Sequence, residues 1–250
     1  MLLKNGVKDK LEIIAYHGWG FSSDFWDVWK KSVPSSVKIK TADRGYFFEK
    51  KSPVFSSNNR SLKLLFLHSF GAHWCPAEQL MQADIVIIFN GFKTFHPEDK
   101  REKNKSRLLL NRMINRFEDK PQQVLADFLA NSFYPENKDI TFNRDWDNKL
   151  LINDLKRLGE SDFNLKLLSK NGKNVQIFSL EGGKDKILRR SAGKAFTTLT
   201  DQKAVYHFVK EAGHALPVTH TQDCWSFINA MIPIFIHNEY NREKKATGSS

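Results

Sequence analysis

The stretch Leu62–Pro76, which reads LKLLFLHSFGAHWCP, constrains the fold of this chain more than any other. Its unbroken apolar run, which ends at Leu67, is typical of a parallel strand that is buried on both faces. Ser69 follows where such a strand turns sharply into a helix, and a turn of this kind holds the serine hydroxyl clear of the sheet. Crowding favours small residues two positions before and after the serine. Gly71 meets the second requirement, and Leu67 departs from the first.

Composition describes an ordinary globular chain with an unusual charge. The 250 residues suit a single α/β domain with one substantial core, and 40% hydrophobic with 27% charged residues excludes a disordered or fibrous chain. The 39 Lys and Arg residues against 28 Asp and Glu give a formal net charge of +11. This surplus favours an anionic partner such as nucleic acid, an anionic membrane or an acidic protein, and a merely solvated basic surface is the alternative.

The sequence gives no sign of export or of a membrane span. Cys75 and Cys224 are the two cysteines, which suits a reducing compartment better than a disulfide framework. The first ten residues lack the apolar region of a secretory signal, and no apolar run approaches the roughly 20 residues that cross a bilayer. We therefore expect a cytoplasmic protein that does not associate with membranes, and a monomer.

Strand and helix patterns alternate along most of the chain. Apolar runs predict five further strands, at Leu11–Tyr16, Val37–Thr41, Asp84–Asn90, Val175–Leu180 and Ala204–Val209. Helical spacing between them predicts an α/β fold with a mostly parallel central sheet and helices on both faces. Pro76 predicts that the helix after Ser69 is short or interrupted, because proline is not tolerated in a helix interior. A final amphipathic helix is expected at Thr221–Ile236.

The strand signal disappears between residues 93 and 174. Apolar residues at helical spacing predict three helices there, at Lys100–Phe117, Gln122–Phe133 and Trp146–Leu158. We expect residues 1–92 and 175–250 to form the core and residues 93–174 to form a helical lid over the strand ends. The first of these helices is strongly basic, and its Arg112 and Arg116 share one face. That face is either simply solvated or a docking surface for an anionic partner.

Three residues of complementary chemistry follow predicted strands in the order serine, aspartate, histidine. Ser69, Asp185 and His214 should therefore meet at the carboxyl edge of the sheet, where open α/β sheets bind ligands. A serine hydroxyl becomes a good nucleophile when an imidazole within about 2.6–3.2 Å takes its proton. A carboxylate on the far side of the imidazole fixes its tautomer and stabilises the imidazolium. The pattern predicts a Ser–His–Asp catalytic triad.

Four motifs resemble the α/β-hydrolase superfamily over nearly the whole chain, from Leu11 to about Ile236. They are the H-G loop His17–Gly20, the elbow Leu67–Gly71, the acid turn Gly182–Asp185 and the pair Gly213–His214. The resemblance implies an oxyanion hole made by the backbone N–H groups of Trp19 and Phe70. It also implies that the helical lid is inserted between the sixth and seventh strands of the full fold.

Within that superfamily, the HGWG loop and the stretch Met113–Phe117 resemble the biotin-pathway esterases, which cleave the methyl ester of pimeloyl-acyl carrier protein. The resemblance implies a serine carboxylesterase that forms an acyl-enzyme on Ser69 and needs no cofactor or metal. Because carrier proteins are acidic, a basic lid would steer and dock one. The candidates for carrier docking and for lining an acyl channel are Arg107, Arg112, Arg116, Phe117, Phe128, Phe133 and Trp146.

Other functions are compatible with the same residues. The same machinery serves other serine esterases, thioesterases and C–C bond hydrolases, whereas a serine at position 69 disfavours dehalogenases, which use an aspartate nucleophile. Leu67 in the elbow motivates a non-catalytic binding protein of the same fold. Nucleic-acid binding rests on net charge alone, since no recognisable module is present. The scattered histidines match no metal-ligand motif.

Overall fold

The structure is a computed structural model of the chain. It describes residues 10–57, 61–142, 144–172, 175–188, 192–194, 196 and 204–233. The first nine residues and the end of the predicted helix 221–236 lie outside the described residues, and that helix is present from 221 to 233. No helix in these ranges has the combination of length and apolar character that a bilayer span requires.

Six parallel strands form one sheet, in the order β2-β1-β3-β4-β5-β6. All six predicted strands are present, as β1 (Lys10–Tyr16), β2 (Lys38–Thr41), β3 (Ser61–His68), β4 (Ile85–Phe89), β5 (Gln176–Gly182) and β6 (Val205–Val209). The chain adds β2 on one side of β1 and all later strands on the other, so the winding direction reverses beside β3. Ligands bind outside the carboxyl ends of strands at such a switch point.

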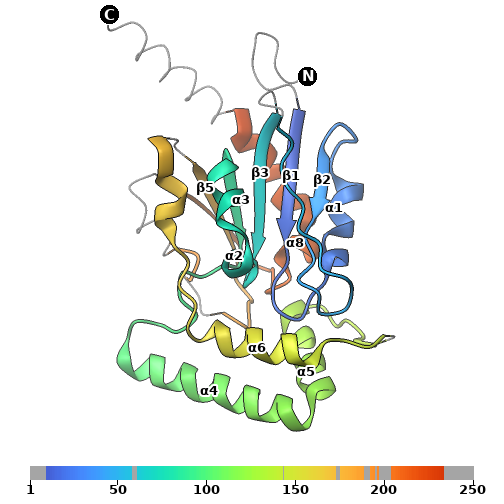
Figure 1. Cartoon of the computed structure of the whole chain (residues 1–250), viewed down its shortest axis with the longest axis vertical. Helices are drawn as coiled ribbons and strands as arrows, with labels where there is room; N and C mark the ends of the chain where they lie inside the picture. Colours follow the sequence, from blue (N-terminus) through green and yellow to red (C-terminus); the bar gives the residue numbers. More distant parts are fainter. Residues whose placement is uncertain are drawn as a thin grey trace, which may run out of the picture.

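Side chains alternate between the two faces of the sheet, and helices cover both (Figure 1). On one face, strand residues such as Ile13 and Phe66 pack against η1 (Ser23–Trp26), α1 (Asp27–Ser32), α8 (Leu216–Thr219) and helix 221–233. On the other, Leu65 and Leu67 pack against α2 (Gly71–Trp74), α3 (Ala77–Gln82) and η2 (Leu165–Gly172), the last of which was not predicted. The predicted interruption after Ser69 is confirmed, because Pro76 separates α2 from α3.

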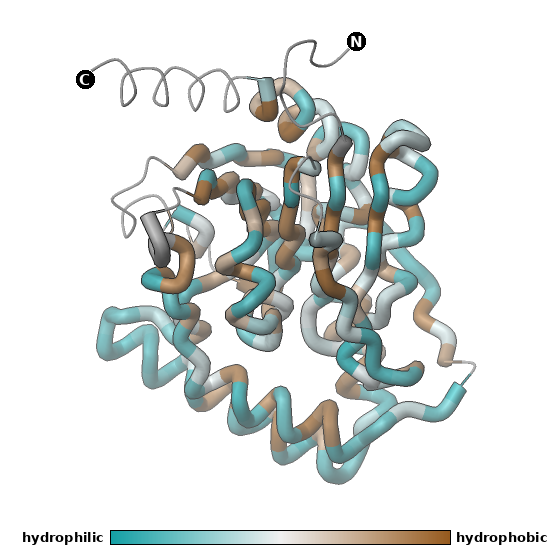
Figure 2. The backbone as a smooth tube through the Cα atoms, turned by 45° about the horizontal axis from the view of Figure 1, so that its top comes forward, coloured by the Kyte–Doolittle hydropathy of each residue, from teal (hydrophilic) through white to brown (hydrophobic). Residues whose placement is uncertain are grey.

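Three α-helices precede η2 in the described chain between β4 and β5, which are its fourth and fifth strands. They are α4 (Lys100–Asp119), α5 (Pro121–Phe133) and α6 (Asn148–Leu158), called here the cover helices. The last begins two residues later than predicted because Asp147 caps it. Figure 1 shows the cover helices across the end of the sheet to which the strands point. Hydrophilic residues dominate the outer helix α4 (Figure 2).

A separate apolar cluster joins the cover helices to the loops at the strand ends. Its core-side members include Trp19, Tyr46 and Phe70, and its helical members are Leu110, Phe117, Val124, Leu125, Leu151, Leu155 and Leu158. Each cover helix therefore buries an apolar face directly above the carboxyl edge of the sheet, where the predicted catalytic residues lie.

Candidate active site

Ser69 sits on a strained turn directly after β3. Its backbone φ is +52°, in the left-handed region that L residues other than glycine rarely adopt. Gly71 is required two positions later, because a Cβ there would lie 2.5 Å from the carbonyl oxygen of Tyr16. Leu67 is fully buried in the strand and packs with Ala72 in the apolar cluster of its face. The leucine is thus accommodated by the sheet, and the turn keeps its geometry without a small residue there.

The structure brings Ser69, His214 and Asp185 into one hydrogen-bonded line. Ser69 Oγ lies 2.9 Å from His214 Nε2, and His214 Nδ1 lies 2.7 Å from Asp185 Oδ2. Because a carboxylate can only accept, Nδ1 carries the proton and Nε2 is free to accept from the serine hydroxyl. The His214 ring is fully buried and the Asp185 side chain is 6% exposed, so water competes little for either bond.

Asp185 is itself held by the backbone of its own turn. The Oδ1 oxygen accepts hydrogen bonds from the N–H groups of Ile187 at 2.7 Å and Leu188 at 2.9 Å. The other oxygen is left for the imidazole. This division of the two oxygens favours one orientation of the His214 ring.

Two backbone amides are candidates for an oxyanion hole: that of Phe70, directly after Ser69, and that of Trp19 in the H-G loop. Within the described part of the chain, neither the Trp19 N–H nor the Phe70 N–H donates to a protein acceptor. The H-G loop approaches closely because position 18 is glycine: a Cβ on Gly18 would lie 3.0 Å from Ser69 Cβ. Free amides beside a nucleophilic hydroxyl are the arrangement that an oxyanion hole requires.

His17 fixes the start of this loop as a neutral imidazole. Its Nδ1 donates to the Gly18 carbonyl at 2.8 Å, and its Nε2 accepts from the Arg44 N–H at 3.1 Å. Complete burial lowers the pKa of His17 to about 4. The ring therefore stays neutral near pH 7, which is the state that lets Nε2 accept the Arg44 amide.

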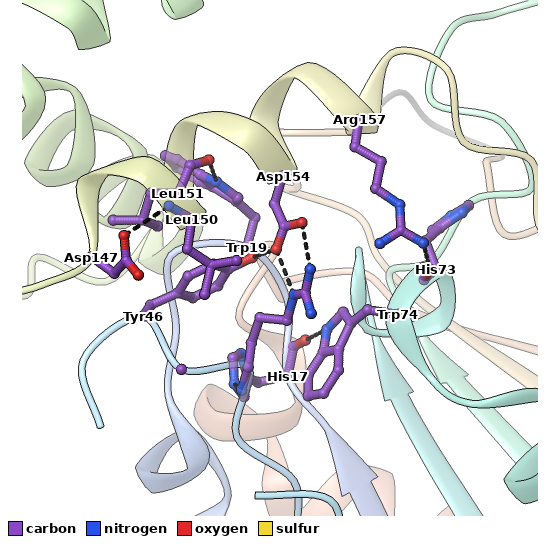
Figure 3. Close-up of polar contacts among 12 residues, drawn as sticks. His17, Trp19, Tyr46, His73, Trp74, Asp147, Leu150, Leu151, Asp154 and Arg157 are labelled. Atoms are coloured by element: carbon purple, nitrogen blue, oxygen red, sulfur yellow. Dashed lines mark hydrogen bonds and ion pairs between the residues drawn. The ribbon is translucent and has the colours of Figure 1, made fainter. Parts of the chain in front are cut away.

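Helix α6 is anchored to the same loops by a buried carboxylate (Figure 3). Asp154, 2% exposed, accepts from Arg44 Nε at 2.6 Å, from a terminal Arg44 nitrogen at 2.8 Å and from the Tyr46 hydroxyl at 2.7 Å. The indole N–H of Trp19 donates to the Leu151 carbonyl of α6 at 2.8 Å. The residue that offers a candidate oxyanion amide is thus tied by its side chain to a cover helix.

Sequence reasoning missed Asp154, Arg44 and Tyr46. One signal was available: Asp154 lies at helical spacing from Leu151 and Leu158, on the face that the helix buries. A buried carboxylate is costly without a cationic or hydrogen-bonding partner, so an acid on an apolar face indicates one elsewhere in the chain. The sequence does not say where that partner is.

Of the predicted aromatic residues, Phe128 lies nearest to the triad. Its ring centroid is 4.8 Å from that of Trp19 and 6.4 Å from that of His214. Phe117 reaches Trp19 at 6.0 Å. Phe133 instead lines a groove of about 450 Å³ whose lining residues do not include Ser69.

The remaining predicted docking residues lie farther out. Trp146 packs on Phe142 with ring centroids 5.1 Å apart and shares no ring contact with the triad among the described residues. Arg107, Arg112 and Arg116 are exposed on α4. Arg116 forms a 2.9 Å ion pair with Asp127, an interaction between exposed side chains.

These features define a class of protein. The α/β-hydrolase fold has a parallel sheet with a serine on a strained strand-to-helix turn, and with aspartate and histidine at the ends of later strands. The chain has this fold. No protein-family model matches the chain, and no curated protein matches it by sequence.

Solved structures of the same fold match it over nearly its whole length. An esterase from Exiguobacterium antarcticum has a TM-score of 0.71 at 12% identity, covering 91% of this chain and 93% of that chain. A bromoperoxidase from Bacillus anthracis has a TM-score of 0.68 at 14% identity, covering 92% and 93%. An enol-lactonase from Burkholderia xenovorans LB400 has a TM-score of 0.65 at 11% identity, covering 90% and 92%. Such low identities establish the fold alone.

Proposed function

We propose that the protein is a serine hydrolase of carboxylic esters and that its substrate is the methyl ester of pimeloyl-acyl carrier protein. One observation carries the reaction class: the hydrogen-bonded line from Ser69 Oγ through His214 to Asp185, at distances of 2.9 and 2.7 Å. Several proteins with solved structures of the same fold are described as esterases, which supports this class.

The first half-reaction transfers the acyl group to Ser69. The hydroxyl oxygen attacks the ester carbonyl while His214 Nε2 takes its proton, and Asp185 stabilises the resulting imidazolium. Negative charge develops on the former carbonyl oxygen, which the N–H groups of Trp19 and Phe70 stabilise; removing one such donor typically costs 10²–10³ in rate. The intermediate then collapses: the C–O bond to methoxide breaks, and His214 returns the proton so that methanol leaves.

The second half-reaction releases the acid. Water attacks the acyl-enzyme carbonyl as His214 takes one of its protons, and the same amides stabilise the second oxyanion. Collapse breaks the ester bond to Ser69, which regains its proton from His214. The net reaction consumes one water and yields methanol and the free carboxylic acid, so no cofactor enters the balance.

The carrier-bound substrate is supported by the charge of the cover helices. Arg107 and Arg112 are exposed on α4, and the net charge of +11 favours an acidic partner. The Phe128 ring, with its centroid 4.8 Å from that of Trp19 and 6.4 Å from that of His214, offers apolar surface to an acyl chain beside the triad. Charge pairing of this kind acts mainly on association rate and register.

The test measures methanol release from pimeloyl-acyl carrier protein methyl ester and from a short free methyl ester. We expect the wild type to hydrolyse both and the Ser69→Ala variant to hydrolyse neither. Reversal of charge at two positions, Arg107→Glu with Arg112→Glu, should lower kcat/KM for the carrier-bound ester and leave that for the free ester unchanged. A matched control reverses Lys31 and Lys38, which are exposed on α1 and β2.

The outcomes separate the class from the substrate. Hydrolysis of the free ester but not of the carrier-bound ester would support the proposed serine hydrolase and contradict the proposed carrier-bound substrate. Methanol release at the wild-type rate by the Ser69→Ala variant would contradict both proposals. Growth of a biotin auxotroph that lacks its pimeloyl-ester esterase, restored by the wild type and not by Ser69→Ala, would support the pathway.

A further inference from the structure

The main-chain carbonyl of His214 accepts hydrogen bonds from two buried side chains. His68 Nε2 lies 3.0 Å from this oxygen, and Asn90 Nδ2 lies 2.8 Å from it. The two donors stand at the carboxyl ends of the neighbouring strands β3 and β4, whereas His214 lies in the loop that follows β6. That loop has no regular secondary structure before α8, so its position depends on bonds of this kind.

Asn90 uses its whole amide group to join two loops. Its Nδ2 also donates to the Gly213 carbonyl at 2.9 Å, and its Oδ1 accepts from the Gly182 N–H at 2.7 Å. Both amide hydrogens and the oxygen are therefore engaged. Gly182 opens the turn that carries Asp185, so one side chain connects the acid turn to the histidine loop.

Asn90 holds this position in an uncommon backbone conformation. Its φ is +44°, and it is one of two non-glycine residues with positive φ in the described part of the chain; the other is Ser69. Asparagine tolerates the left-handed region better than most residues. The residue is 1% exposed, so an amide that lost these partners could not turn to water.

His68 is held as a neutral donor. Because a carbonyl oxygen can only accept, His68 Nε2 carries the proton and Nδ1 is bare; Nδ1 has no hydrogen-bond partner among the described residues. The ring is fully buried and stacks on Phe25 with centroids 4.5 Å apart. Burial lowers the pKa of His68 well below its ordinary value, so the ring stays neutral and its donor stays aimed at His214.

We propose that Asn90 and His68 are positioning residues for the general base: together they fix the backbone of His214 so that its imidazole meets both Ser69 and Asp185. This inference rests on the proposed function. Hydrogen bonds at the two ring nitrogens orient the imidazole but do not set where its backbone lies. Two donors from adjacent strands supply that constraint, and Asn90 sets the acid turn at the same time.

Asn90→Gly is the direct test, because glycine adopts the left-handed backbone and lacks only the amide. With p-nitrophenyl acetate as substrate, we expect kcat to fall on the order of 10²-fold, as for a small misplacement of a catalytic group, with KM within about 2-fold of wild type. Ser179→Ala is the matched control. Its hydroxyl is also fully buried and also donates to a backbone carbonyl, that of Gly193 at 3.0 Å, but outside the catalytic loops. It should lose stability and keep kcat.

A second pair of variants keeps the inference testable if Asn90→Gly does not fold. His68→Gln retains an amide donor of similar reach, and His68→Leu removes the donor at similar volume. We expect His68→Leu to lower kcat about 10-fold or more and His68→Gln to restore most of it, with melting temperatures measured for both. Equal kcat for these two variants and wild type would overturn the role of His68, and wild-type kcat for a folded Asn90→Gly would overturn that of Asn90.

The failure of this inference differs from the failure of the proposed function. If the wild type hydrolyses the ester in a Ser69-dependent way but the positioning variants keep its kcat, the positioning role is wrong and the hydrolase stands. If wild type and Ser69→Ala show the same background rate, the hydrolase itself is wrong, and the positioning role is overturned with it.

Discussion

Replacement of Asp154 by asparagine should detach helix α6 from the loops beneath it. The carboxylate accepts three hydrogen bonds, two from Arg44 and one from Tyr46, and the aspartate side chain is 3% exposed against 18% for the arginine. An asparagine keeps one acceptor oxygen at most in this geometry, so at least one donor loses its partner. The guanidinium also loses its counter-charge while it remains mostly buried.

The expected cost follows from this burial. Removing one member of a buried ion pair typically costs 3–5 kcal/mol, because the remaining charge is uncompensated. Asp154→Asn should cost about 3 kcal/mol, near the lower end of this range, because Arg44 is partly exposed and asparagine retains one acceptor. Glu118→Gln is the matched control: it also removes an ion pair that joins α6 to another element, with Lys156 of α6 at 3.2 Å, but both side chains are more than half exposed. Exposed pairs contribute about 0–1 kcal/mol.

Urea unfolding of the two variants measures the difference. The product of the change in midpoint and the m-value should be about 3 kcal/mol for Asp154→Asn and below about 1 kcal/mol for Glu118→Gln. Exchange of all three groups for apolar side chains, Arg44→Met and Tyr46→Phe with Asp154→Leu, should recover most of the loss, since neither a buried charge nor a buried hydroxyl is then left without a partner. If Asp154→Asn costs no more than Glu118→Gln, the buried carboxylate does not anchor α6 and this reasoning is refuted.

Three further predictions concern the elbow, the acid and the H-G loop. Gly71→Ala should destabilise the protein by about 1–3 kcal/mol and slow ester hydrolysis, because its Cβ would lie 2.5 Å from the Tyr16 carbonyl; an unchanged melting temperature and rate would contradict this. Asp185→Asn should lower kcat by on the order of 10⁴-fold with little change in KM, because the amide favours the wrong tautomer of His214; a loss of less than about 10-fold would contradict it. Burial lowers the pKa of His17 from 6.5 to about 4, so the unfolded chain binds a proton between these values that the folded protein does not. Stability should therefore fall as pH drops from 6.5 toward 4, by up to about 3 kcal/mol from this residue. The urea midpoint of the His17→Gln variant should fall less over this pH range than that of the wild type; an equal fall in both proteins would contradict the prediction.

The sequence predicted the sheet well because parallel strands that are buried on both faces leave an unmistakable apolar run. All six strands, the interruption at Pro76 and the three cover helices follow from such local patterns. The meeting of Ser69, Asp185 and His214 also followed, since residues after parallel strands share one edge of the sheet.

Contacts between side chains and distant backbone could not be predicted in this way. Asn90 ends a predicted strand and looks like an ordinary cap residue, because its partners are carbonyl and amide groups that any residue carries. Along the chain, Gly182 lies more than 90 residues from Asn90, and His214 lies more than 120 residues from it. Asp154 did leave a signal on the buried face of its helix, but its partner Arg44 lies in a loop with no pattern of its own.

The central claim is that Ser69 is a nucleophile activated by His214. A fluorophosphonate probe followed by peptide mass mapping tests it most directly. We expect one adduct, on Ser69, that is absent from Ser69→Ala and forms at least about 10²-fold more slowly in His214→Gln. An unmodified Ser69 in folded wild-type protein, or an adduct that forms as fast without the imidazole, would contradict it.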